Sequence, residues 1–208
     1  SFEYKNFDDF TNFVELVYLK TSFDETIVHS SDVAYFIDAV KDLNQSIKFQ
    51  GDINGTISTL SAKNLKFNYG DMTSFEGEIK FNGLGVLKNP IINAKISHLI
   101  TFEEDIKNIP LPPFKLGKTI KTPNWMKNVG EIEFEGDFNG PTSNFEATGI
   151  VKTSAGIIKS DVFFTRDSVE DETKIVGKII TDKFDLGKTI GNSNFGLLSM
   201  NGALDALA

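Results

Sequence analysis

Alternation of apolar and polar residues is the dominant pattern along this chain. From Ile47 to Gly55, an apolar residue or glycine stands at every odd position and a polar residue at every even position. A period of two is typical of a β-strand with one dry face and one solvated face. Nearly the same phrase returns at 132–140, and a shorter form ending in glycine stands at 79–83 and 198–202. We therefore predict a strand at each of these four segments.

The similarity between copies extends beyond single strands. Ile92–Ile96 is matched by Ile175–Ile179, and Phe114–Ile120 is matched by Phe184–Ile190. Repetition of several strands joined by Gly and Asn turns predicts a mainly β fold. We expect repetitive antiparallel strands that form a curled sheet or a taco-like β-groove, with one or two short helices. The predicted division is 1–45 for N-terminal strands plus an amphipathic helix, then repeated units over 46–129 and 130–195 and a truncated unit over 196–208. A repeat that stops within a unit leads us to expect an excerpt of a longer protein.

Three segments interrupt the strand pattern. Apolar residues at helical spacing predict a helix over 31–43, with Ser31 or Asp32 as its N-cap. Acidic residues ahead of Lys107 predict a short helix within 102–109, with a solvated acidic first turn. The proline-rich stretch 109–113 is expected to be an extended connector. The stretch 10–20 fits a strand or a helix, and Leu16–Leu19 favours a strand slightly.

Composition narrows the function classes. The 208 residues carry a formal net charge of −8, no cysteine and 19 phenylalanines. An acidic chain is a poor partner for nucleic acid, because phosphate binding depends on basic patches. Without cysteine there is no thiolate nucleophile and no Cys-based zinc site. No apolar run approaches the roughly 20 residues of a membrane-spanning helix.

Candidate catalytic groups do not form a convincing set. His29 and His98 stand apart in strand-like contexts, which indicates structural histidines. The acids at 103–105 suit a solvated helix start better than a pair of catalytic carboxylates. The acids that alternate over 131–137 are replaced by Lys48, a glutamine and an aspartate in the other copy, which indicates only a solvated face. We assign no catalytic, cofactor or metal residue, and a hydrolase is the weakest of the hypotheses.

The feature that repeats is an apolar face. A sheet with such a face must cover it with another sheet, curl around it, or bind something apolar. Packing against another sheet is the usual solution in an ordinary domain, and binding of lipid is the alternative. Ten residues are predicted to form a lipid-facing apolar groove: Ile47, Phe49, Ile53, Phe67, Ile79, Phe81, Ile132, Phe134, Phe138 and Ile179.

Several segments resemble a known family. The run 64–84, the segments 92–99 and 110–113, and the motif 184–188 are similar to the periplasmic repeat region of TamB proteins, the translocation and assembly module branch of the AsmA-like family. Ser31–Phe36 resembles the segment that precedes the repeats in such proteins. The resemblance implies a periplasmic β-groove within a protein anchored in the inner membrane by an N-terminal helix outside this chain.

The resemblance also implies a function and partners. Such proteins are implicated in phospholipid transport between the inner and outer membranes. They also act in outer-membrane biogenesis, with a barrel-type outer-membrane assembly protein that would meet regions outside this chain. The leading hypothesis is therefore a non-enzymatic groove for phospholipid acyl chains, with no cofactor and no nucleic-acid partner. The alternative is a structural or interaction module with a closed core that binds client strands at its sheet edges.

Overall fold

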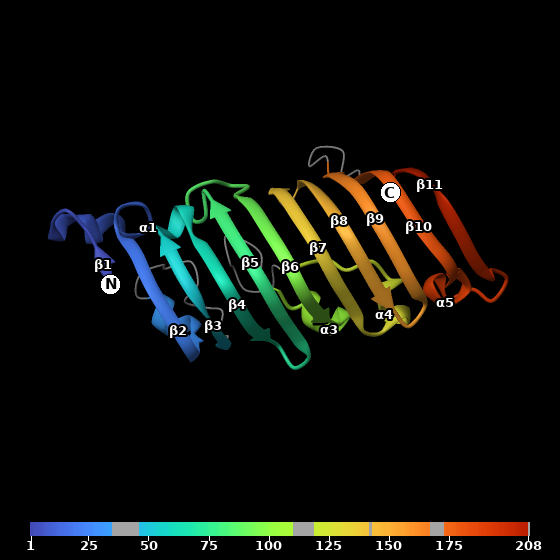
Figure 1. The fold of residues 1–208 in the computed structure, drawn as a ribbon, viewed down its shortest axis with the longest axis horizontal. Coiled ribbons are helices and arrows are strands. Elements are labelled where there is room, and N and C mark those ends of the chain that lie inside the picture. The colour runs from blue at the N-terminus through green and yellow to red at the C-terminus, as the bar shows by residue number, and fades with distance from the viewer. Residues whose placement is uncertain (35–45, 110–118, 142, 167–172, 208) are drawn as a thin grey trace.

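The computed structural model describes residues 1–208 except 35–45, 110–118, 142, 167–172 and 208. Its described part is one eleven-stranded antiparallel sheet in which each strand pairs with its neighbours in the sequence (Figure 1). The strands are β1 (Phe2–Glu3), β2 (Tyr18–His29), β3 (Ser46–Gly55), β4 (Ser61–Tyr69), β5 (Thr73–Asn82), β6 (Ile91–Thr101), β7 (Ile132–Pro141), β8 (Asn144–Thr153), β9 (Gly156–Arg166), β10 (Thr173–Asp185) and β11 (Leu197–Leu207). The sheet is not closed into a barrel, so the predicted mainly β fold with repetitive antiparallel strands is confirmed.

Short helices join some of the strands. They are η1 (Phe7–Asn12), α1 (Phe13–Leu16), α2 (Ser30–Val33), η3 (Ile57–Thr59), α3 (Glu103–Ile106), α4 (Met126–Val129) and α5 (Leu186–Ile190). Figure 1 shows α3, α4 and α5 at the same end of the strands. Within the described residues the short helices are therefore more numerous than the one or two that the sequence predicted.

The four segments predicted as strands all lie in strands. The copies at 47–55 and 132–140 lie in β3 and β7, and the shorter copies lie in β5 and β11. Each full copy begins a succession of four strands followed by a short helix, β3–β6 with α3 and β7–β10 with α5, and β11 then follows. The repeated-strand character is confirmed, while the division into units at 46–129, 130–195 and 196–208 stays a prediction.

The helix predicted over 31–43 needs correction at its start. The helix expected over 31–43 begins at Ser30, and its N-cap is His29 without a side-chain hydrogen bond, so Ser31 and Asp32 are not the cap. Most of that predicted helix lies outside the described residues. In the stretch 10–20, for which both strand and helix were open, α1 ends at Leu16 and β2 begins at Tyr18, and Val17 between them is fully buried.

Strand register arranges the side chains of one face into rows across the sheet. One row consists of Phe49, Phe67, Phe75, Leu99, Phe134, Val151, Ile158 and Thr181. A second row consists of Ile53, Ala62, Ile79, Ala94, Phe138, Ala147, Val162, Gly177 and Leu204. Cross-strand neighbours of this kind are the unit of sheet stabilisation. The apolar side chains of β3–β10 therefore form one continuous face, which we call the inner face.

Candidate functional site

The two faces of the sheet differ in chemistry. On the outer face, charged side chains pair between neighbouring strands, with Nζ to carboxylate oxygen distances of 3.1 Å for Lys48–Glu25, 2.9 Å for Lys66–Glu76 and 3.0 Å for Lys152–Glu133. These pairs are largely solvated, and such pairs stabilise a fold by at most about 1 kcal/mol each. Their main effect is to keep the outer face of the sheet solvated. The inner face is apolar and is the candidate functional surface.

The inner face of β2–β7 encloses a groove of about 920 Å³. We call this volume the apolar groove. It is lined by Val28, Ser30, Ile47, Phe49, Phe67, Tyr69, Thr73, Phe75, Ile79, Phe81, Ile92, Ala94, Ile96, Leu99, Thr101, Ile106, Ile109, Phe134 and Phe138. Its volume is near the upper end of the range for small-molecule sites, and the lining contains no ionisable acid or base other than a tyrosine.

Seven of the ten residues predicted from the sequence line the apolar groove. They are Ile47, Phe49, Phe67, Ile79, Phe81, Phe134 and Phe138. The other three lie elsewhere. Ile53 packs beside the groove against the cluster of Ala62, Leu65 and Phe75. Ile132 belongs to a second buried cluster, and Ile179 lies on β10, outside the lining.

The second cluster explains why Ile132 is removed from the groove. Ile132 is only 9% exposed and packs with Val129, Ala155 and Phe184 at the end of the strands where α4 lies. α4 was not predicted from the sequence, and it covers the start of β7. Strand periodicity assigned Ile132 to the correct face, but it could not show that a helix would cover it.

Some lining residues were missed because β-bulges change the phase of a strand. In β6, alternation from Ile92 through Ile96 would place residue 98 inward, but the register shifts between Ile96 and Leu99. Leu99 therefore faces inward and pairs with Phe134. A bulge adds one residue to a strand and leaves little trace in the hydrophobic pattern. Ile106 and Ile109 were missed for another reason, since they come from α3 and the segment just after it.

The inner face is incompletely covered by protein. The accessible surface of the chain is 13,016 Å², whereas a compact monomer of 23.0 kDa exposes about 9,600 Å². Apart from Ile132, which is buried, and Ile47, which is 39% exposed, the predicted groove residues are half-buried. The described residues thus do not close a core over this face.

Aromatic rings from neighbouring strands contact one another on the inner face. Ring centroids lie 4.8 Å apart for Phe67 and Phe75, and 4.5 Å apart for Phe138 and Phe145. Near the middle of β7, Gly136 has φ +156°, and a Cβ there would collide with the Thr148 carbonyl oxygen. The ring of Phe134 occupies the space above this glycine, since its Cζ would lie only 3.0 Å from such a Cβ. Glycine at this position therefore allows the close approach of β8 and leaves room for the ring of Phe134.

A buried carboxylate fixes α3 at one end of the apolar groove. Asp105 is 5% exposed and accepts hydrogen bonds from the Asp71 N–H (3.2 Å), the Met72 N–H (3.0 Å) and Thr73 Oγ1 (2.8 Å). Thr73 Oγ1 also lies 2.8 Å from Thr101 Oγ1. Burial raises the pKa of Asp105, but the hydrogen bonds from Thr73, Met72 and Asp71 outweigh it and leave the pKa below its usual value. The turn between β4 and β5 is thus tied to α3.

The predicted solvated acidic first turn of α3 is therefore wrong. Glu103 is 3% exposed, accepts a hydrogen bond from Thr122 Oγ1 at 2.6 Å and pairs with Lys107. The hydrogen bond from Thr122 is the main reason that the pKa of Glu103 is lowered. Only Glu104 is exposed. These carboxylates hold the connector against the sheet, and each already has partners, so they do not form a catalytic pair.

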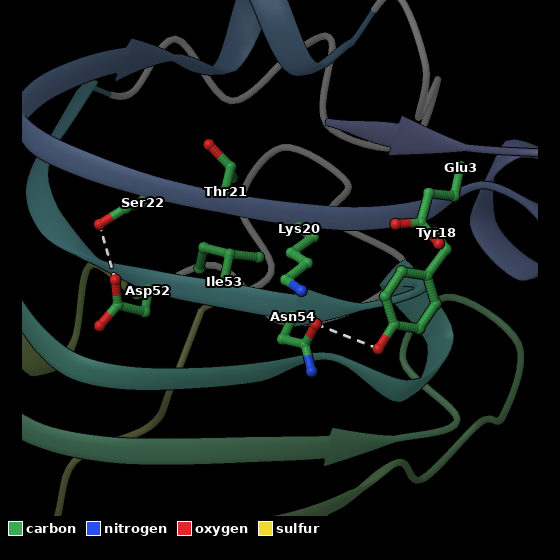
Figure 2. A pocket seen from close by; sticks show the side chains of 8 residues that line it. All are labelled: Glu3, Tyr18, Lys20, Thr21, Ser22, Asp52, Ile53 and Asn54. Carbon is green, nitrogen blue, oxygen red and sulfur yellow. Dashed lines mark hydrogen bonds between the residues drawn. The ribbon is translucent and has the colours of Figure 1, made fainter.

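A polar hollow lies at β2 and β3, lined mainly from the outer face. It has a volume of about 590 Å³, and Figure 2 shows Ser22 bonded to Asp52 and Tyr18 bonded to Asn54. Asp52 also accepts a hydrogen bond from Asn64 Nδ2 at 2.8 Å. Hydrogen bonds from Ser22 and Asn64 lower the pKa of Asp52. This carboxylate is therefore ionised, and its oxygens already accept hydrogen bonds from these two side chains. An arrangement of this kind stabilises the strand pair and supplies no free base.

The remaining polar candidates do not converge. Ser46 Oγ lies 2.6 Å from His29 Nδ1 at the end of β2, and His98 is exposed on β6. Within the described ranges, no three His, Cys, Asp or Glu residues are grouped so that they could hold a metal ion. In the same part of the chain, no helix has both the length and the apolar character needed to cross a bilayer. The apolar groove is thus the best-formed candidate site.

Comparison of the chain with protein-family models, with curated proteins and with solved structures finds no match. The resemblance to the TamB branch of the AsmA-like family therefore stays a prediction.

Proposed function

We propose that this chain is a segment of a β-groove that holds the acyl chains of phospholipids. The observation that carries the proposal is the apolar groove of about 920 Å³, whose lining is mainly aliphatic and aromatic over six consecutive strands, β2–β7. A site for a polar metabolite would present unpaired donors or acceptors, whereas the hydroxyls of Thr73 and Tyr69 are already bonded to Asp105 and to the Asn108 carbonyl. The apolar groove therefore fits an apolar ligand that needs no specific polar contact.

The binding force is the hydrophobic effect. Each methylene that leaves water contributes about 0.8 kcal/mol, so an acyl chain is held without a specific polar contact. Because this force has no direction, neighbouring positions along the rows from Phe49 to Ile158 bind an acyl chain in similar ways. The lipid head group remains in water at the open side of the groove. A ligand held in this way moves by diffusion along the face.

The wider proposal includes location and partners. We propose that the chain belongs to the periplasmic part of an AsmA-like or TamB-like protein that is anchored in the inner membrane through a segment outside this chain. Phospholipid transport between the two membranes and outer-membrane biogenesis, with a barrel-type assembly partner, follow from that family resemblance. The groove chemistry supports the lipid part of the proposal, while the partner and the location depend on the resemblance alone.

Binding of a fluorescent phospholipid to the purified chain tests the proposal. Phe134→Asp places a charge on the inner face, and Phe163→Asp makes the same change on the outer face of β9, where Phe163 is 43% exposed. We expect Phe134→Asp to reduce lipid binding at least tenfold and Phe163→Asp to leave it unchanged. Circular dichroism and a cooperative urea transition establish that both variants are folded.

A milder variant covers the case in which Phe134→Asp does not fold. Ile47 lines the groove but is 39% exposed, so Ile47→Asp disturbs packing less. Equal lipid binding by wild type, Ile47→Asp and Phe163→Asp would contradict the groove proposal. Loss of lipid binding in Phe163→Asp alone would indicate that lipid binds the outer face, and this result would also contradict the groove proposal.

A second candidate function is a strand-binding module. The described residues form an open sheet rather than a closed one, and the strand edges of an open sheet favour binding of an extended strand. If the chain is a strand-binding module, it does not bind lipid, and substitutions in the apolar groove leave strand binding unchanged. The closed core that the sequence allowed for this alternative is not formed by the described residues.

A further inference from the structure

The two ends of the apolar groove differ. Its lining residues that lie outside the strands are Ser30, Ile106 and Ile109, which follow β2 and β6. In an antiparallel sheet these strand ends lie on the same side as the β4–β5 turn, so we call this the capped end. At the other end, the open end, the lining stops at Phe81 and Ile92, and the described segments that join β3 to β4, β5 to β6 and β7 to β8 contribute none of it. The described residues thus cap the groove at one end.

The cap belongs to a longer wall of short helices. Ile106 of α3 and Met126 of α4 pack against the same buried cluster, which contains Ile132. Asn128 Nδ2 of α4 donates a hydrogen bond of 2.9 Å to the Thr189 carbonyl of α5. Figure 1 shows α3, α4 and α5 at this end of the strands. The wall therefore runs across the strands, beside the inner face of both repeats.

The polar side chains at the capped end already have partners. Thr73 Oγ1 and Thr101 Oγ1 lie 2.8 Å apart, and Thr73 Oγ1 also donates to Asp105. The Tyr69 hydroxyl donates to the Asn108 carbonyl at 2.7 Å. A phosphate buried among these groups would lose its water without gaining a donor from them, and the Asp105 carboxylate would repel it. The capped end therefore favours a hydrocarbon and disfavours a lipid head group.

The groove is long enough for a whole acyl chain along the strands. From Thr73 to Phe81 the lining on β5 is about 27 Å long, at about 3.4 Å per residue. One acyl chain spans about 15 Å, half of the hydrocarbon core of a bilayer. The end of an acyl chain at α3 thus leaves the rest of the chain on the inner face and the head group in water.

We infer that α3 fixes the orientation of a bound phospholipid, with the terminal methyl of the acyl chain against Ile106 and Ile109 and the head group directed toward the open end. Ile106 and Ile109 are then positioning residues. Because the wall of α3, α4 and α5 runs across the strands, the lipid keeps this orientation as it moves from strand to strand. This inference rests on the proposed lipid function and adds a direction to it.

The single tryptophan of the chain reports the capped end. Trp125 is the N-cap of α4 and precedes Met126, which packs with Ile106 against the buried cluster. A nitroxide quenches tryptophan fluorescence only at short range. The probes are two lysophosphatidylcholines, used below their micelle concentration, whose acyl chain carries a nitroxide either near the ester or near the terminal methyl. We expect the probe labelled near the methyl to quench Trp125 more strongly.

Moving the tryptophan provides the matched control. The double variant Trp125→Phe/Phe81→Trp places the reporter at the open end, since Phe81 is the last lining residue of β5. We expect the order of the two probes to reverse in this variant. A difference in affinity between the probes would give the same order at both ends, so the reversal isolates orientation.

A lysine at the capped end tests the positioning role. Ile109→Lys brings an ammonium to the lining, where it attracts the phosphate, so we expect the difference between the two probes to be lost. Ile190→Lys makes the same change on α5, where Ile190 is 44% exposed and outside the lining, and should keep the difference. Circular dichroism establishes that both variants are folded. An unchanged difference in folded Ile109→Lys would contradict the positioning role.

Failure of the inference differs from failure of the proposed function. Equal quenching of Trp125 by both probes, or the same order of the probes at both ends, would overturn the fixed orientation while lipid binding stands. Absence of quenching by either probe, with the tryptophan at either end, would contradict the lipid function and the orientation together.

Discussion

Removal of the Asp105 carboxylate should destabilise the fold through one identifiable set of contacts. Asp105 is 5% exposed and accepts three hydrogen bonds that tie the β4–β5 turn to α3, at 2.8–3.2 Å from Thr73, Met72 and Asp71. Hydrogen bonds to a charged group contribute about 1.5–3 kcal/mol each, and part of this is regained when water enters the vacated site. We expect the free energy of unfolding to fall by about 2 kcal/mol in Asp105→Asn and by about 3 kcal/mol in Asp105→Ala. Urea denaturation at pH 7 measures both values.

The pH dependence of the free energy of unfolding gives a sharper test of the role of the Asp105 carboxylate. The folded state lowers the pKa of Asp105 below its ordinary value of 3.8, so the ionised carboxylate stabilises the fold. This contribution is fully present above the unfolded-state pKa and is lost as the pH falls through the lower, folded-state pKa. The difference between wild type and Asp105→Asn should therefore be constant at neutral pH and shrink below about pH 4. A thermal or urea series from pH 7 to pH 2.5 records it.

Glu104 supplies the matched control. It is the exposed neighbour in the same helical turn, so Glu104→Gln should change the free energy of unfolding by less than about 0.5 kcal/mol. If Asp105→Asn were as stable as Glu104→Gln, or if its deficit did not depend on pH, the reasoning about the buried carboxylate would be refuted.

Three further predictions concern the sheet and its connectors. Gly136→Ala should destabilise the chain by about 3 kcal/mol or more, because φ +156° disfavours a side chain and the Cβ would meet the Thr148 carbonyl; Gly196→Ala, with open space around it, should be neutral in the same urea assay. Glu133→Gln breaks an exposed pair with Lys152, so we expect a loss of less than about 1 kcal/mol that disappears in 1 M salt; a larger, salt-independent loss would contradict this. Thr122→Val removes the hydrogen bond to Glu103, so the pKa of Glu103 should rise in an NMR titration, and an unchanged pKa would exclude Thr122 as its main cause.

Much of the sheet could be predicted because the pattern is local. Alternation along Ile47–Gly55 and its copies identifies strands, and the parity of Phe49, Phe134 and Phe138 assigns these side chains to one face. The positions of seven of the ten predicted groove residues follow from this rule alone. The rule needs no knowledge of distant contacts.

The predictions from the sequence fail where a distant contact or a shift of register determines which way a side chain faces and whether it is buried. Leu99 faces inward because a bulge interrupts the phase of β6. Asp105 is buried because the turn at Asp71–Thr73, more than thirty residues earlier, presents three donors to it. Neither event leaves a periodic signal in the sequence, so an acidic cluster was interpreted as solvated.

The sequence by itself determined the strands, their repetition and the chemical contrast between the two faces of the sheet, since the side-chain period of a strand is a property of the backbone. Only the tertiary structure decided that these strands form a single open sheet, that α3 and Asp105 fix one end of the apolar groove, and that α4 covers Ile132. Those features depend on which strands pair, in which register, and on what packs across their ends. The phenylalanines thus form a continuous apolar face only because pairing brings residues such as Phe49, Phe67 and Phe75 into one row.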